Sequence, residues 1–217
     1  MPTLLLRLAG PLQSWGVGSK FEIRLTENEP TKSGVIGMIA AALGRRRDEP
    51  IDDLASMKFG VRVDRPGVLL RDFHTAKLVK TAKKTESYVT YRYYLSDAVF
   101  LAGLESDDRD LLAKIEYALK NPVFPLFLGR RSCPPTLPIV WGMRECSILD
   151  ALKDEAPLVE GADKMRVRYD SSSGSAMKRD MPISFDVRHR KYGYRYEAED
   201  WVSFGSLDEE HDPMAEL

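Results

Sequence analysis

The alternation of apolar and polar residues along the chain predicts a protein that mixes strands and helices. Residues 3–9 (TLLLRLA) and the alternating residues 21–25 (FEIRL) have the composition of β-strands. Residues 57–63 and 68–74 predict two more strands around a turn at residues 64–67 (DRPG). A further strand-like run occupies residues 89–104.

Two other segments predict helices. Residues 35–43 are apolar and rich in alanine, with Thr31 or Ser33 placed to cap the N-terminus and Gly44 placed to end the helix. Residues 107–119 form an amphipathic pattern with acidic residues in the first turn. The chain therefore carries one buried and one amphipathic helix between its strands.

The order of these elements predicts an α+β, ferredoxin-like fold of the βαββαβ type with an inserted hairpin. The two helices would cover one face of the sheet and leave the other free to bind a strand of RNA, as in RRM domains. The aromatic signature of RRM domains is absent from the sequence. Beyond about residue 150 the chain changes character, and alternating stretches in residues 164–204 predict a small β-rich C-terminal piece.

Composition places the chain among soluble globular proteins, since 43% of its 217 residues are hydrophobic and 30% are charged. The formal net charge is −1, which argues against a basic protein that binds nucleic acid on its own. Residues 199–217 hold seven acidic and no basic side chains. The rest of the chain, with 32 basic and 26 acidic side chains, carries +6 and could bind a polyanion. We expect residues 205–217 to be a mobile acidic tail.

The sequence contains no pattern for a cofactor, a metal site or a membrane span. Cys133 and Cys146 form neither a disulfide framework nor a zinc pattern, and a reducing, cytoplasmic location is the simplest interpretation. The longest nearly apolar run, residues 34–44, is too short to cross a bilayer.

Two segments have the composition of phosphate-binding loops. Residues 30–34 (PTKSG) resemble the end of a P-loop but lack its glycine before the lysine, so Lys32 and Ser33 either contact one backbone phosphate or Ser33 simply caps the helix. In Gly129-Arg130-Arg131-Ser132 the glycine lets the backbone approach a ligand and the guanidinium groups match phosphate oxygens. The alternative is an exposed turn with solvated arginines, and we favour the phosphate contact.

The stretch 71–95 combines basic and aromatic residues. Lys77, Lys80 and Arg92 lie close in sequence to Tyr91 and three other tyrosines, a mixture that suits single-stranded nucleic acid. The alternative is a sheet edge on which tyrosines pack and lysines discourage aggregation. Trp15, in Gln13-Ser14-Trp15, could likewise stack on a base or fill the core.

His74 is the histidine with the most suggestive neighbours. Asp72 lies two residues before it, on the same face of the predicted strand. An acid–base role is conceivable, although a structural hydrogen bond or a contact with a nucleotide is the commoner use of such a histidine.

Taken together, five segments resemble one known family. GPLQSWG, PTKSGVIGMIAAALG, RDFHT, YRYYLSDAVF and PLFLGRRSCPP, in this order, are similar to the CasD-type subunits of type I-E Cascade, a CRISPR surveillance complex. The resemblance covers residues 3–140 and is weak beyond them. It implies a RAMP-superfamily, RRM-like domain at 1–145 with a thumb hairpin at about 76–94, followed by a C-terminal subdomain at 146–204.

The resemblance also implies a function. Such subunits bind and cap the 5′ handle of CRISPR RNA, contact the adjacent backbone subunit and the large subunit, meet target DNA only indirectly, and do not cleave. Handle contacts are expected at Gln13, Ser14, Trp15, Lys32, Ser33, His74, Lys77, Lys80, Tyr91, Arg92 and Gly129–Ser132. The alternative is a metal-independent endoribonuclease, as in type I-C homologues, with His74 and either Tyr91 or a thumb lysine. A scaffold that binds only protein is a third possibility.

Overall fold

The protein is an α+β molecule built on one large antiparallel sheet. The computed structural model describes residues 1–16, 22–81 and 84–204, apart from the side chains of residues 78–81 and 84–85. Within these residues the large sheet has the strand order β10 (Ala176–Ser184), β11 (Lys191–Ser203), β9 (Lys164–Asp170), β4 (Lys58–Arg65), β7 (Val99–Glu105), β1 (Thr3–Ala9) and β8 (Val140–Arg144). Every pair in it is antiparallel.

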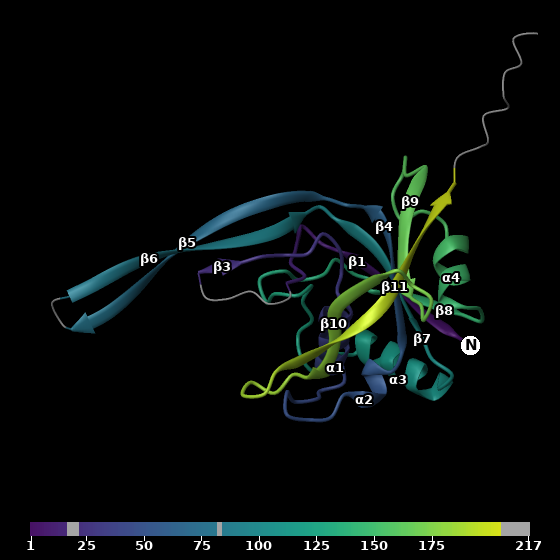
Figure 1. Cartoon of the computed structure of the whole chain (residues 1–217), viewed down its shortest axis with the longest axis horizontal. Helices are drawn as coiled ribbons and strands as arrows, with labels where there is room; N and C mark the ends of the chain where they lie inside the picture. Colours follow the sequence, from purple (N-terminus) through teal and green to yellow (C-terminus); the bar gives the residue numbers. More distant parts are fainter. Residues whose placement is uncertain (17–21, 82–83, 205–217) are drawn as a thin grey trace, which may run out of the picture.

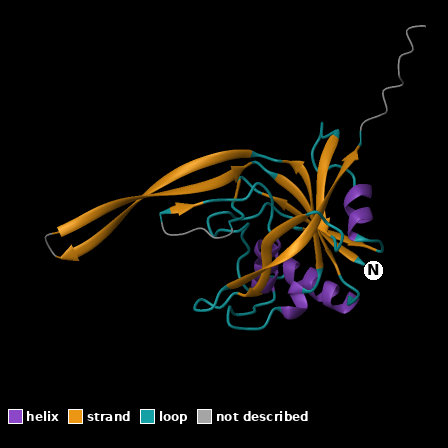
Figure 2. Ribbon diagram, in the orientation of Figure 1, coloured by secondary structure: helices purple, strands orange, loops and turns teal. Residues whose placement is uncertain are grey.

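Helices lie on both faces of the large sheet (Figure 2). The main core joins Leu4, Leu6 and Leu8 of β1 to the buried sides of α1 (Lys32–Ala42) and α3 (Arg109–Lys120), with the short α2 (Asp52–Ala55) beside them. Of the two predicted caps of α1, Thr31 is the one that accepts a hydrogen bond from the amide of Gly34, and Ser33 lies within the helix. The amphipathic pattern of residues 107–119 corresponds to α3, which is capped by Asp108.

The second face of the central strands is not left free, contrary to the expectation from sequence. Helix α4 (Ile148–Asp154) covers it, and Leu5 and Leu101 pack against Ile148 and Leu152 without any exposure. Arg62 on the same face is fully buried, where it pairs with Asp64 and donates to carbonyls at the end of α4. Sequence reasoning missed α4, because seven residues are too few to show a helical period.

A second, smaller sheet carries a long hairpin that projects from the body (Figure 1). Strands β5 (Val68–Thr81) and β6 (Lys84–Ser96) pair along their length, and β6 also pairs with β2 (Leu12–Gln13) and, in parallel, with β3 (Ile23–Arg24). The predicted thumb at 76–94 is therefore too short. The segment 68–74, expected as a strand of the central sheet, is instead the first half of the hairpin.

The run at residues 89–104 is two strands in different sheets. The chain turns between β6 and β7 at Asp97, whose φ of 55° is in the left-handed region. Asparagine and aspartate tolerate this region better than most residues. Residues typical of strands lie on both sides of the break, so composition alone hides it.

The C-terminal segment is rich in strands, as predicted, and it continues the large sheet. Strand β9 pairs with β4, and β10 lies against α1, with Phe185 near Gly37. The predicted boundary at 145/146 falls between β8 and α4 within this continuous sheet. The predicted acidic tail at 205–217 lies outside the described residues. Among the described residues, no helix is long and apolar enough to cross a membrane.

Candidate nucleic-acid interface

The segment Gln13-Ser14-Trp15 lies inside the protein. The side-chain amide of Gln13 donates to the carbonyls of Leu8 and Ala98, at 3.2 and 2.7 Å, and its oxygen accepts from the indole of Trp15 at 3.0 Å. Trp15 is 1% exposed, and Ser14 donates to the carbonyl of Tyr93. Of the two roles left open for Trp15, the structure shows the core residue, because a buried ring cannot stack on a base.

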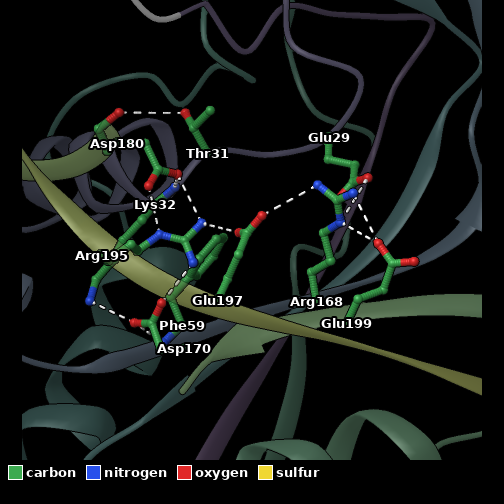
Figure 3. Close-up of polar contacts among 11 residues, drawn as sticks. Glu29, Thr31, Lys32, Phe59, Arg168, Asp170, Asp180, Arg195, Glu197 and Glu199 are labelled. Carbon is green, nitrogen blue, oxygen red and sulfur yellow. Dashed lines mark hydrogen bonds and ion pairs between the residues drawn. The ribbon is translucent and has the colours of Figure 1, made fainter. Parts of the chain in front are cut away.

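The N-terminus of α1 is occupied by a carboxylate of the chain itself. The backbone amide of Lys32 donates to Asp180 at 2.9 Å, and its ammonium group pairs with Asp170 at 3.0 Å (Figure 3). Lys32 is only 3% exposed and Ser33 is also buried. A helix N-terminus attracts an anion, and here Asp180 fills that role, so the side chains expected to hold a phosphate are not presented to one.

Arg195 links these two acids into a buried ionic network (Figure 3). Its guanidinium group contacts Asp180 at 2.6 Å, Asp170 at 2.7 Å and Glu197 at 3.1 Å. Burial alone would lower the pKa of Arg195, but the hydrogen bonds and charges of Asp180 and Asp170 outweigh burial and raise this pKa. The network ties β9, β10 and β11 to the start of α1.

The network continues toward the surface through Arg168. This side chain lies among Glu29, Glu197 and Glu199 (Figure 3), with contacts of 3.9, 3.3 and 3.0 Å. Arg166, which is on the same strand as Arg168, also pairs with Glu29. Arg166, Arg168 and Arg195 are thus neutralised by neighbouring acids and do not form a free cationic surface.

The Gly129–Ser132 loop divides its two arginines between inward and outward positions. Arg130 donates to the carbonyls of Tyr93, Arg24 and Leu25, at 3.2, 2.7 and 3.2 Å, and its guanidinium group lies 4.9 Å from the ring centre of Tyr94. Arg131 and Ser132 are exposed. Arg130 therefore fastens the loop to the base of the hairpin, and Arg131 is the cation that this loop presents to solvent.

The backbone conformation at position 129 requires glycine. Its φ is +84°, and a Cβ atom there would lie 1.7 Å from the carbonyl oxygen of Ser14. Only glycine allows this contact, so the close approach that the sequence suggested for a ligand is made by the backbone of residue 14.

The hairpin exposes basic and aromatic side chains to solvent, as a surface that binds single-stranded RNA requires. Strand alternation and pairing place Arg71, Phe73 and Tyr91 on one face, with the guanidinium group of Arg71 5.5 Å from the ring centre of Tyr91. Phe73 is 67% exposed, and Lys77 is also exposed. The side chain of Lys80, predicted as a further contact, lies outside the described residues.

The opposite face of the hairpin holds the histidine and its acid. His74 Nε2 lies 2.7 Å from Asp72 Oδ2, and both side chains are nearly half exposed. Arg92 is cross-strand from Asp72 and is half-buried. The pairing inferred from the two-residue spacing is present, and the pair faces away from Phe73 and Tyr91.

A pocket of about 530 Å³ opens beside α1. It brings together four of the predicted residues, Ser14, Trp15, Ser33 and Gly129, which form part of its lining. The rest of the lining includes Arg46, Arg47, Phe185, Arg190 and Tyr192. The hairpin residues and this pocket are two separate candidate surfaces.

Comparison with known proteins decides the family. A family model described as CRISPR-associated protein (Cas_Cas5) matches residues 3–196. The chain belongs to the Cas5 family of CRISPR-associated proteins. The match extends well beyond residue 140, where the resemblance in sequence motifs faded.

Individual Cas5-like proteins agree with this assignment. The chain is 37% identical to the CRISPR system Cascade subunit CasD of Escherichia coli (strain K12) over 161 residues, which cover 66% of this chain and 72% of that protein. A solved structure titled "CRISPR RNA-guided surveillance complex" contains a chain with 36% identity and a TM-score of 0.78, covering 93% of this chain and 90% of its own length. Another, titled "Crystal structure of Cas protein", has 42% identity and a TM-score of 0.76, covering 93% and 95%.

Sequence reasoning missed the far wall of the pocket in this Cas5 chain. Phe185, Arg190 and Tyr192 are about 150 residues from α1, and only the folding of β10 and β11 against that helix brings them to it. The run Arg45-Arg46-Arg47 just after α1 was the one local signal. Phe73 was also missed, because the tyrosines of the same stretch dominate its composition.

Proposed function

We propose that this Cas5 chain is the subunit of a Cascade surveillance complex that binds and caps the 5′ handle of CRISPR RNA without cleaving it. Support comes from the family assignment, from the similarity to a protein named as a Cascade subunit, and from the similarity to a chain of a CRISPR RNA-guided surveillance complex. Such a complex works where its RNA is transcribed, so we place the chain in the cytoplasm.

The proposal includes the ferredoxin-like nature of the central strands. Strands β4, β7, β1 and β8 are neighbours in that order, and α1 and α3 lie in the chain between them in the succession β1, α1, β4, β7, α3, β8. This succession and this strand order support the βαββαβ arrangement. The hairpin then projects from the link between the second and third of these strands, where a thumb can reach an RNA held beside the body.

One observation carries the RNA-binding proposal: the hairpin exposes aromatic and cationic side chains together, away from the body. Phe73, Tyr91 and Arg71 share a face, and Lys77 follows on the same strand. Rings at such positions stack on unpaired bases and cations follow the phosphates. Exposed apolar residues at the base of the hairpin, Val68 and Leu69, suit contact with a neighbouring backbone or large subunit.

The test replaces Phe73 and Arg71 with alanine in the complete complex of this chain, its partner subunits and its RNA. We expect Phe73→Ala to weaken binding of handle RNA about tenfold, since a stacked base contributes ~1–3 kcal/mol. We expect Arg71→Ala to lower the slope of log affinity against log salt by about 0.7. Lys114→Ala, an exposed lysine on α3, is the matched control and should change neither.

Unchanged RNA affinity and salt slope in both hairpin variants would count against the hairpin as the RNA-binding surface. Absence of any discrete small RNA from the purified complex would count against the function itself and favour a purely protein-binding scaffold.

The His74–Asp72 pair favours one alternative, a metal-independent endoribonuclease. A carboxylate 2.7 Å from Nε2 can orient an imidazole that acts on a ribose hydroxyl through its other nitrogen. Incubation of the complex with its repeat RNA in EDTA separates the two functions. We expect no cleavage, and specific cleavage that disappears in His74→Ala would establish the nuclease instead.

A further inference from the structure

The pocket beside α1 points to a second contact with the same RNA. We propose that it receives one unpaired base of the handle, with the adjoining phosphates held by Arg46, Arg47 and Arg190. The inference rests on the proposed function, because it assumes that this chain binds the handle. It adds a specific nucleotide site in the body, separate from the hairpin.

The first support is a glycine that packing does not require. At Gly34 in α1, a Cβ atom would lie 2.8 Å from the ring of Trp15, so packing excludes a larger residue. At Gly37, one turn later, the nearest atom to a Cβ would be Phe185 Cζ at 3.6 Å, an ordinary contact. Glycine within a helix is less favourable than alanine. What Gly37 provides in return is open space in the floor of the pocket.

The second support is the aromatic wall. The lining includes Phe185, which follows β10, and Tyr192, near the start of β11, together with Phe124 and Phe127 from the segment after α3. These rings are partly exposed. An unpaired base has two π-faces that such rings can cover, and the volume of about 530 Å³ lies within the usual range for small-molecule sites.

The third support is charge. Four arginines line the pocket, at positions 45, 46, 47 and 190, and no aspartate or glutamate does so among the residues that the structure describes. Arg45 is engaged with Asp53. The guanidinium groups of Arg46, Arg47 and Arg190 are exposed, and none of them forms a hydrogen bond or ion pair with another residue in the described part of the chain.

These features favour a nucleotide over a protein side chain. Three exposed guanidinium groups beside a ring-lined cavity match the two parts of a nucleotide, because guanidinium groups bind phosphate oxygens in a bidentate manner and rings stack on the base. The pocket also adjoins Gly129, at the start of the loop whose Arg131 is exposed near the base of the hairpin. A single strand could therefore leave the hairpin and enter the pocket.

The test fills the pocket from its floor and is made in the assembled complex with its partner subunits. Gly37→Leu directs a branched side chain into the space, and Gly37→Ala adds one methyl group at ordinary contact distance as the matched control. We expect Gly37→Leu to weaken binding of handle RNA about tenfold or more, and Gly37→Ala to stay within about twofold of the parent. A photoreactive base in the handle should crosslink to Phe185 or Tyr192 in the parent and not in Gly37→Leu.

A second variant covers the case in which Gly37→Leu destabilises the fold. Both arginines are exposed, so the double change Arg46→Ala with Arg47→Ala should leave the melting temperature unchanged and lower the salt slope by about 1.4, or ~0.7 for each phosphate contact. Lys114→Ala should leave the slope unchanged.

Three results would overturn the inference. The first is equal RNA affinity of Gly37→Leu and Gly37→Ala in folded protein. The second is an unchanged salt slope in the arginine variant. The third is loss of a protein subunit from Gly37→Leu while RNA binding is kept, which would assign the pocket to a protein partner. If the parent complex binds no handle RNA at all, the proposed function fails as well, so the two failures are distinguishable.

Discussion

The start of α1 and the hairpin are both cationic in sequence, but the charge at α1 is buried and paired, whereas the charges on the hairpin are exposed to solvent. At α1 the ammonium group of Lys32 is buried against Asp170, and Asp180 occupies the helix N-terminus. On the hairpin Arg71 and Lys77 remain at the surface among exposed rings. A basic motif therefore indicates a binding surface only when no acidic side chain from elsewhere in the fold pairs with it. For Lys32 the acids come from strands about 140 residues later.

The largest expected effect breaks the buried side of this comparison. Asp180→Ala leaves the amide of Lys32 without its acceptor and removes one of the three acids that contact the buried Arg195. Removing one partner of a buried ion pair costs about 3–5 kcal/mol. Urea denaturation should show this loss in the free energy of unfolding. Asp72→Ala, which removes an exposed acid from the hairpin, is the control and should change stability by less than about 0.5 kcal/mol. Equal effects of the two changes would refute the contrast.

The next effect concerns the junction where the loop at Gly129 meets Ser14. Gly129→Ala introduces a Cβ that collides with a backbone oxygen as well as an unfavourable φ, and we expect a loss of about 3 kcal/mol. Gly161→Ala isolates the backbone term, because its φ is +74° and no atom lies within 4 Å of its added Cβ. That control should lose about 1 kcal/mol. Similar losses in thermal denaturation would mean that the contact with Ser14 is not tight.

Arg130 and Arg131, adjacent in one loop, show the same contrast between a cation bonded within the fold and a cation exposed to solvent. Arg130→Ala removes donors from three carbonyls and should cost about 2 kcal/mol of stability. Arg131→Ala should leave stability within about 0.5 kcal/mol and lower the salt slope of RNA binding by about 0.7. Unfolding curves and binding isotherms measure the two effects separately. The account is wrong here if Arg131→Ala unfolds the protein and Arg130→Ala does not.

The smallest effect is a dependence on pH at the rim of the pocket. The hydrogen bond from Arg45 holds the pKa of Asp53 below its ordinary value of 3.8. The pair therefore stabilises the fold above that value and ceases to do so as the pH falls through the lowered pKa. Since Asp53 is well exposed, Asp53→Asn should cost less than about 1 kcal/mol at pH 7, and the cost should fade below about pH 4. A difference in melting temperature that grows toward acid pH would contradict this sign.

Local pattern was sufficient for the elements whose surroundings are simple. The apolar stretch of β1, the capping residue Thr31 and the amphipathic face of α3 each have a signal within a few residues. Local pattern could not separate β6 from β7, because both segments have the composition of strands and only a short polar step at Asp97 marks the turn. Nor could it show that β5 leaves the central sheet, since a strand looks the same in either sheet.

The candidate site was harder to predict for a related reason. Exposure depends on distant partners: Trp15 contacts Gly34 of α1, and Lys32 meets the acids of β9 and β10. His74 and Asp72 could be paired from sequence because their contact follows from strand alternation alone. The pocket needs elements from both ends of the chain, and no single stretch of sequence contains its pattern.

Handle RNA is proposed to follow the surfaces that the fold leaves cationic and aromatic. Photocrosslinking of the intact complex, with a reactive base placed in turn at each position of the handle, tests this most directly. We expect crosslinks to Phe73 or Tyr91 on the hairpin and to residues that line the pocket, such as Phe185 or Tyr192, with none to the buried Gln13. Crosslinks of the first handle nucleotides to a different subunit, with none to this chain, would contradict it.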